Sequence, residues 1–279
     1  MIKLVAIDVD GTLLNRNNQL TGETKEIISQ VRALGVKVVL CTGRPFQGIQ
    51  FFLDELGLDE LGEYAISFNG AVTQALGTHA VIRHQSLTFS EFLEIETLSR
   101  HLKMPFHIQS DKGIYTANRE ISQYTAYDSY LNGSDINYRM VAELRGVPIN
   151  KVLFVGSQSD LTKMIPQIPQ SFFEKYHLVR SLDYFFEFLP RNANKGNALK
   201  ALADDLGITP EGIMAIGDND NDVSMLDFVG LSVTMENGSE NAKQSADFIT
   251  KSNEANGVAY ALSKLVLQNS NIKILESIQ

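Results

Sequence analysis

The chain begins with short apolar runs, and a segment whose apolar residues recur at helical spacing separates the first two. Residues 2–7 (IKLVAI), 36–41 (VKVVLC) and 64–68 (YAISF) are almost wholly apolar, which is typical of strands buried on both faces of a parallel sheet. Between the first two runs, residues 21–34 repeat apolar side chains at helical spacing, and Gly35 is a natural helix stop. The order strand, helix, strand predicts a βαβ unit.

The same pattern returns near the C-terminus. An apolar stripe at 199–206 predicts a helix that ends at a glycine, and the run 213–217 (IMAIG) predicts another buried strand. A second short helix at 223–228 precedes a strand at 231–235 (LSVTM), and a short last strand is expected at about 247–250. Both ends of the chain therefore predict parts of one parallel sheet.

The middle of the chain has a different pattern. Helix-like stretches (89–103, 119–131 and 158–167) alternate with short strand-like stretches (105–109, 114–117, 151–155, 177–182 and 184–189). Tight turns at 111–113 and 182–183 favour antiparallel hairpins. We therefore predict an α/β fold: a Rossmann-like parallel-sheet core from residues 1–83 and 189–279, with an inserted α+β domain at 84–188. The polar tail after about residue 268 is expected to be loose.

Composition narrows the class of protein. The chain has 279 residues, a net charge of −9 and a single cysteine, Cys41. An acidic chain without a basic stripe is a poor nucleic-acid binder. No secretory signal is recognisable and no apolar run approaches the ~20 residues of a membrane span, so we expect a cytoplasmic protein without nucleic-acid or membrane partners. Monomer and homodimer both stay open.

The ends of the predicted strands carry most of the candidate chemistry, because ligands of open α/β sheets bind at the carboxyl ends of the strands. These ends read Asp8-Val9-Asp10-Gly11-Thr12, Thr42-Gly43-Arg44, Asn69-Gly70 and Gly217-Asp218-Asn219-Asp220-Asn221-Asp222. So many carboxylates at one edge would repel one another without a cation between them. Hard oxygen ligands, few of them from protein, suit Mg²⁺ bound together with a phosphate.

Donors for a phosphate accompany these acids. Thr42 offers a hydroxyl, and Gly43 offers a backbone N–H that a ligand can approach closely. Lys195 stands at the start of a predicted helix, where the helix N-terminus and the ammonium both favour an anion. Together these groups predict a site for in-line phosphoryl transfer.

Four motifs carry a family resemblance. DVDGT at 8–12, Thr42-Gly43-Arg44, Lys195-Gly196 and GDNDND at 217–222 resemble, in order, the four motifs of the haloacid dehalogenase superfamily. An insert of over a hundred residues between the second and third motifs is similar to the Cof-type subfamily with its C2-type cap. The resemblance covers nearly the whole chain. It implies Mg²⁺-dependent hydrolysis of small phosphomonoesters, such as sugar phosphates or similar metabolites.

The resemblance also implies catalytic roles. Asp8 would attack phosphorus and form an aspartyl-phosphate. Asp10 would protonate the leaving oxygen and then activate water. An aspartate at position 10, rather than serine or threonine, favours hydrolysis over dehalogenation or a long-lived phosphoenzyme.

Ligand roles follow from the same resemblance. The metal would be bound by Asp8, the backbone carbonyl of Asp10 and Asp218, with Asp222 supporting the metal or orienting Lys195. The groups that would hold the phosphate are the Val9 amide, Thr42, Gly43, Lys195 and Asn221. Arg44 would either face the substrate or pair with acids near the metal.

Other interpretations stay open at this point. A phosphomutase of the same superfamily would share the DVDGT opening, but the arginines at 100, 119, 139, 145 and 180 are scattered rather than grouped for a second phosphate. A non-catalytic phosphate-binding module is the third possibility. Asp222 could instead cap the helix that follows it, and Asn69 could touch the ligand or serve the turn alone. Cys41 is expected to be a buried strand residue, since a thiol phosphatase needs arginine where Gln47 stands.

Overall fold

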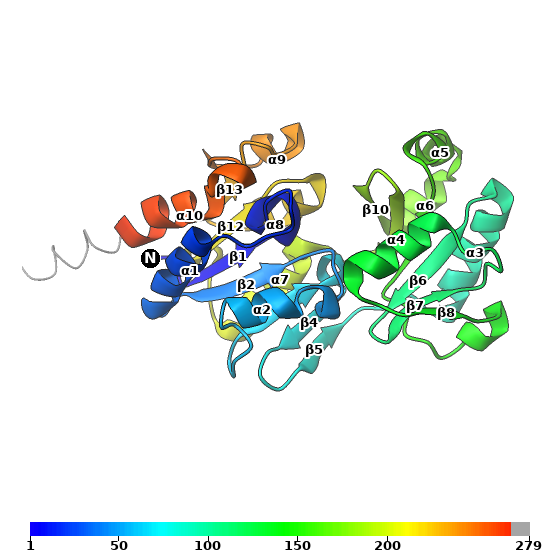
Figure 1. Ribbon diagram of the computed structural model, residues 1–279, viewed down its shortest axis with the longest axis horizontal. Helices are drawn as coiled ribbons and strands as arrows, with labels where there is room; N and C mark the ends of the chain where they lie inside the picture. Colours follow the sequence, from blue (N-terminus) through cyan, green and yellow to red (C-terminus); the bar gives the residue numbers. More distant parts are fainter. Residues whose placement is uncertain (269–279) are drawn as a thin grey trace, which may run out of the picture. The chain divides into compact units, whose positions relative to one another are not determined.

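The computed structural model describes residues 1–268, so the expected loose tail lies outside the described residues. The chain divides into two compact units (Figure 1). The first contains residues 1–42, 51–82 and the chain from Asn194 onward; the second contains residues 43–50 and 83–193. The domain boundaries that we predicted from the sequence stay a prediction.

The first unit is built on an eight-stranded sheet. Its order is β14-β13-β12-β1-β2-β3-β4-β5. The strands are β1 (Leu4–Ile7), β2 (Lys37–Cys41), β3 (Tyr64–Ser67), β4 (Val72–Ala75), β5 (Ala80–His84), β12 (Ile213–Gly217), β13 (Leu231–Thr234) and β14 (Phe248–Ile249). All pairs from β14 to β3 are parallel, as predicted. β4 is antiparallel to β3; β4 and β5 were not predicted.

Helices cover both faces of this sheet. They are α1 (Gly22–Ala33), α2 (Gln50–Glu55), α7 (Lys195–Leu206), α8 (Val223–Leu226), α9 (Glu240–Gln244) and α10 (Gly257–Leu262). α1 and α10 pack against each other (Figure 1). Leu199 and Leu202 of α7 pack against Leu4 and Ala6 of β1 and belong to a fully buried cluster. Because neighbouring residues of a strand face opposite sides, β1 needs apolar side chains at every position.

Capping residues set both ends of α7, the helix that carries Lys195. α7 begins after Asn194, whose side-chain oxygen accepts a hydrogen bond from the N–H of Asn197. It ends at Gly207, which has the left-handed φ of +64°. An N-cap and a C-terminal glycine of this kind satisfy backbone groups that the helix leaves unpaired. Lys195 is therefore held in the first turn of α7.

The second unit contains a six-stranded sheet in the order β10-β11-β9-β6-β7-β8. Its strands are β6 (Phe106–Ser110), β7 (Gly113–Thr116), β8 (Ile136–Tyr138), β9 (Lys151–Val155), β10 (Tyr176–Leu182) and β11 (Phe185–Pro190), and its helices are α3 (Phe89–Leu102), α4 (Gln123–Asn132), α5 (Gln158–Met164) and α6 (Gln170–Lys175). Both predicted hairpins are present and antiparallel. The unpredicted β8 pairs in parallel with β7.

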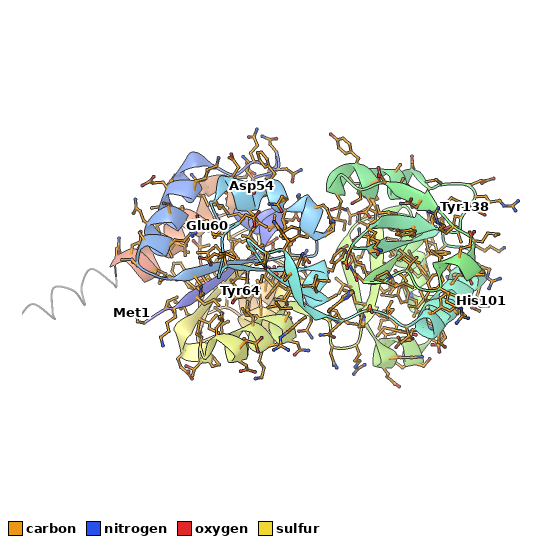
Figure 2. All side chains as sticks on the ribbon, turned by 90° about the horizontal axis from the view of Figure 1, so that it is seen from below. Met1, Asp54, Glu60, Tyr64, His101 and Tyr138 are labelled. Atoms are coloured by element: carbon orange, nitrogen blue, oxygen red, sulfur yellow. The ribbon has the colours of Figure 1, made fainter. Side chains whose placement is uncertain are left out.

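Each unit has its own interior. In the second unit, Phe92 and Ile95 of α3 pack in one buried cluster with Phe106, Phe154 and Phe188 of the sheet. Side chains fill the space between sheet and helices in both units (Figure 2). Among residues 1–268, no helix is long and apolar enough to cross a membrane.

Candidate active site

The loop after β1 brings Asp8 to the carboxyl end of the sheet in the first unit. The N–H of Asp8 donates to the carbonyl of Ile216 on neighbouring β12 (2.9 Å). The loop then folds back on itself, since the N–H of Leu13 donates to the Asp8 carbonyl and that of Leu14 to the Val9 carbonyl. Gly11 has φ +80°, and a Cβ at this position would overlap the carboxylate of Asp218. Glycine is therefore the residue that suits position 11, where the loop after β1 comes closest to Asp218.

Lys195 joins two of the predicted acids. Its Nζ lies 2.5 Å from Oδ1 of Asp8 and 2.6 Å from Oδ1 of Asp222. Lys195 and Asp222 are fully buried, and Asp8 is 4% exposed. An ammonium is tolerated at such depth only when it is paired and hydrogen-bonded. The position of Lys195 at the start of α7 thus links the first and the last motif.

Asp222 binds the loop that precedes it. Its Oδ2 accepts the N–H groups of Asp218 (2.8 Å) and Asn219 (3.0 Å). Its side chain makes no cap hydrogen bond to α8, so the alternative in which Asp222 caps the following helix is wrong. The physical reason is that its two oxygens are already engaged by Lys195 and by the loop amides. Asp218 in turn accepts a hydrogen bond from the Thr12 hydroxyl (2.8 Å).

The acids lie close enough together to hold one metal ion. Asp8, Asp218 and Asp222 each place a carboxylate oxygen within 4.8 Å of the others. Burial and the charge of Asp222 raise the pKa of Asp218 to about 6, and the same influences raise the pKa of Asp8 well above its usual range. Burial alone would lower the pKa of Lys195, but Asp222 and Asp8 outweigh it and the net direction is upward. When all four groups are ionised, negative charge exceeds positive by two, so the donor set fits a divalent cation.

Asp10 differs from the other predicted acids. Its side chain is exposed and does not belong to the group of three carboxylates. An exposed carboxyl beside a buried one is a suitable arrangement for exchanging protons with a ligand and with solvent. The roles of Asp10, as acid and base and through its carbonyl as a metal ligand, stay predictions.

Thr42 and Asn221 are connected through Asn69. Thr42 is buried after β2, and its carbonyl accepts the N–H of Asn69 (2.9 Å). The Asn221 amide Nδ2 donates to Oδ1 of Asn69 (3.0 Å). Apart from the position of all three at predicted strand ends, no sequence signal connects these residues. In the structure Asn69 links two of the predicted phosphate ligands.

Gly43 and Arg44 follow Thr42 in the chain but belong to the second unit. The Gly43 carbonyl accepts a hydrogen bond from Nζ of Lys151 (3.1 Å), and Lys151 forms a buried ion pair with Glu187 (2.8 Å). Arg44 donates from Nη1 to the carbonyl of Gly48 (3.2 Å). The predicted ligand roles of Gly43 and Arg44 stay predictions, and sequence reasoning did not find Lys151 or Glu187.

Three further residues have simple structural roles. Cys41 is buried in β2, and burial raises its pKa to about 12, as expected for a strand residue with a protonated thiol. His107 is buried in β6, where its ring nitrogens lie 3.1 Å from Thr125 Oγ1 and 2.8 Å from Asp128 Oδ2. Asp220 is exposed and accepts hydrogen bonds from Ser239 and Asn241.

A sequence model of the family described as haloacid dehalogenase-like hydrolase matches residues 5–262. The chain belongs to this family. The predicted family and the predicted fold class, a parallel-sheet core with an inserted cap, are confirmed.

Individual known proteins resemble the chain along nearly its whole length. The Bacillus subtilis protein named "Putative phosphatase YxeH" is 42% identical over 96% of this chain and 99% of its own. A second Bacillus subtilis protein, named 5-amino-6-(5-phospho-D-ribitylamino)uracil phosphatase YwtE, is 28% identical over 95% of this chain and 98% of its own. The crystal structure of a haloacid dehalogenase-like hydrolase from Bacteroides thetaiotaomicron has a TM-score of 0.85 at 28% identity, covering 95% of this chain and all of that one. The prediction of an enzyme of the phosphatase type agrees with these relatives.

Proposed function

We propose that this protein is a Mg²⁺-dependent phosphatase that hydrolyses small phosphomonoesters through an aspartyl-phosphate. The observation that supports this best is the buried contact of Lys195 with Asp8 and Asp222, beside Asp218. A carboxylate can attack an anionic phosphoryl group only where nearby positive charge offsets the repulsion. One lysine is too little positive charge for three carboxylates, and a divalent ion held by them would supply the rest.

The residues of the chain divide the reaction between them. Asp8 attacks phosphorus while the bond to the leaving oxygen breaks, and Asp10 gives its proton to that oxygen. Asp10 then takes a proton from water, and the resulting attack on phosphorus frees Asp8 and releases inorganic phosphate. Asp8, the Asp10 carbonyl and Asp218 would hold Mg²⁺, which would supply charge stabilisation of the phosphoryl oxygens. Lys195 would keep the nucleophile ionised and oriented, with Asp222 fixing the lysine.

The proposed substrate is a sugar phosphate or a similar small metabolite. YwtE supports this choice, since its name describes a substrate with a phosphorylated ribityl chain. We expect a panel of phosphorylated sugars and sugar alcohols, scored by kcat/KM, to contain the best substrates. Uniformly low values across that panel, with higher values for other phosphomonoesters, would remove the sugar-phosphate part of the proposal.

Hydrolysis of para-nitrophenyl phosphate tests the nucleophile. Asp8→Asn should lower kcat by at least about a thousandfold, because it removes the group that forms the covalent intermediate. The matched control is Asp220→Asn, which alters an exposed acid of the last motif and should leave kcat unchanged. Circular dichroism would verify the fold of both variants. Wild-type turnover by Asp8→Asn would end the proposed mechanism.

Calorimetric titration with Mg²⁺ tests the metal site without any turnover. Asp218→Asn should weaken binding of Mg²⁺ by about tenfold or more, since it removes one of few charged ligands. Asp220→Asn should bind the ion as the wild type does. Equal affinities of the Asp218→Asn variant and the wild type would exclude Asp218 as a ligand.

A further inference from the structure

The turn after β3 has an unusual backbone. Phe68, Asn69 and Gly70 follow one another with φ values of +51°, +54° and +93°. Glycine and asparagine tolerate the left-handed region, but a bulky aromatic residue is strained there. All three residues are buried. Surrounding contacts must therefore stabilise this conformation.

Those contacts reach three segments that carry predicted phosphate ligands. The Asn69 N–H donates to the carbonyl of Thr42, and the Asn69 side chain accepts from Asn221. Gly70 packs so closely against the backbone carbonyl of Asn194 that a Cβ would overlap it. Asn194 caps α7 and immediately precedes Lys195. One buried turn thus contacts the segments of Thr42, Asn221 and Lys195.

A turn by itself does not account for these features. A connection between β3 and β4 can use asparagine and glycine at positive φ, but it does not require Phe68 to adopt one as well. A turn asparagine typically bonds its own neighbouring backbone. The side chain of Asn69 bonds a residue 152 positions away.

The hydrogen bond also sets the orientation of the Asn221 side-chain amide. An asparagine side chain has one accepting oxygen and one nitrogen with two N–H groups. Because Oδ1 of Asn69 accepts from Nδ2 of Asn221, the second N–H of that nitrogen has a fixed direction. A donor of fixed direction suits a phosphate oxygen, whereas a freely rotating amide would present its carbonyl part of the time.

We infer that Asn69 is a positioning residue, which orients Asn221 and the Thr42 segment for the phosphoryl group. The inference rests on the proposed function, because it assumes that Asn221 binds phosphate. Asn69 acts through Asn221, and the strained turn is kept for the alignment of these segments.

Asn69→Gly separates this role from turn formation. Glycine adopts the left-handed conformation without strain, so the variant should fold, which circular dichroism would verify. It lacks the acceptor for Asn221, so the affinity for inorganic phosphate should fall about three- to tenfold, the effect of one hydrogen bond. Calorimetry with inorganic phosphate and Mg²⁺ measures this. The matched control is Asn18→Gly, the same change at an exposed asparagine with φ +55°, which should bind phosphate normally.

A double-mutant cycle with Asn221→Ala decides whether Asn69 acts through Asn221. The double variant should bind phosphate no more weakly than Asn221→Ala alone. Suppose that Asn221→Ala binds phosphate more weakly than the wild type. Wild-type phosphate affinity of Asn69→Gly, or additive losses in the double variant, would then overturn the inference and leave the proposed function intact. Normal phosphate binding by Asn221→Ala would overturn the inference and also the proposed role of Asn221.

Discussion

At the scale of single residues, Lys195 controls the charge balance of the site. Lys195→Met keeps most of the side-chain volume but leaves Asp8 and Asp222 buried without their cation. Breaking a buried ion pair in this way costs about 3–5 kcal/mol. We therefore expect the free energy of unfolding in urea, measured with a chelator present, to fall by about that amount. Phosphatase activity should be lost at the same time.

Lys200→Met is the matched control for this prediction. Lys200 lies in the same helix and pairs with Asp204 at 2.9 Å, but its side chain is 57% exposed. An exposed pair contributes little to stability, so this variant should unfold much as the wild type does. Similar unfolding free energies for the two lysine variants would show that burial does not make Lys195 important for stability.

The sequence predicted the acids and the lysine of the site but not the bonds among them. Asp8 and Asp218 could be placed together because the carboxyl ends of parallel strands meet at one edge. The partners of Asp222 could not be predicted from the sequence. An aspartate at this position can either cap the helix that follows or accept hydrogen bonds from the loop amides that precede it, and the sequence is the same in both cases. The bond between Asn69 and Asn221 joins distant segments, and no local pattern encodes such a contact.

At the scale of secondary structure, the N-terminus of α3 offers a measurable contribution to stability. The Thr88 hydroxyl accepts the N–H of Glu91, and the Glu91 carboxylate accepts the N–H of Thr88, which forms a capping box. Thr88→Ala removes one half of this arrangement and should cost about 1 kcal/mol of unfolding free energy in urea.

Thr97→Ala provides the comparison within the same helix. Thr97 is exposed, and its hydroxyl donates to the carbonyl of Leu93 inside α3. Alanine has the higher helix propensity, so this variant should be as stable as the wild type or slightly more stable. A larger loss at Thr97 than at Thr88 would contradict the importance of the cap.

The elements that the sequence predicted are those whose own side chains bury a face. β1 and β12 are continuous apolar runs, and α7 has an apolar stripe between two clear caps. The missed elements are short or lie at the edges of the sheets. β5 is exposed at every position, and β8 has three residues. Such strands form because a neighbouring strand offers backbone hydrogen bonds. The hydrophobic pattern of the sequence does not predict this pairing.

At the scale of the whole molecule, the two units differ in how their buried groups titrate. The first unit contains Asp218 and Asp8, whose pKa values lie above their usual range. In the second unit, burial lowers the pKa of His177. The pKa of Asp128 is also lowered, because hydrogen bonds and charge from His107 outweigh the opposing effect of burial. Asp8 and Asp218 therefore bind protons more readily in the folded chain, whereas His177 and Asp128 bind them more readily in the unfolded chain.

Acidification should consequently shift the stabilities of the two units in opposite directions. A carboxyl with a raised pKa takes up its proton in the folded state first, so the metal-free first unit should become more stable as the pH falls through about 6. His177 behaves in the opposite way: below about pH 6.5 the unfolded chain binds a proton that the folded chain does not, so the second unit loses stability. The lowered pKa of Asp128 adds to this loss near pH 4 and below. Hydrogen exchange of chelated protein at about pH 7 and pH 5, corrected for intrinsic rates, measures both changes.

Two controls attribute these shifts to the groups named. His177→Gln cannot titrate, so the loss of protection in the second unit between pH 7 and pH 5 should shrink while the first unit behaves as before. Saturating Mg²⁺ should abolish the gain in the first unit, because the metal binds ionised carboxylates and competes with their protons. A first unit that loses protection on acidification without metal would mean that burial and the charge of Asp222 do not raise the pKa values of Asp8 and Asp218 in the folded protein. The case for a cation at this site would then lose its electrostatic basis.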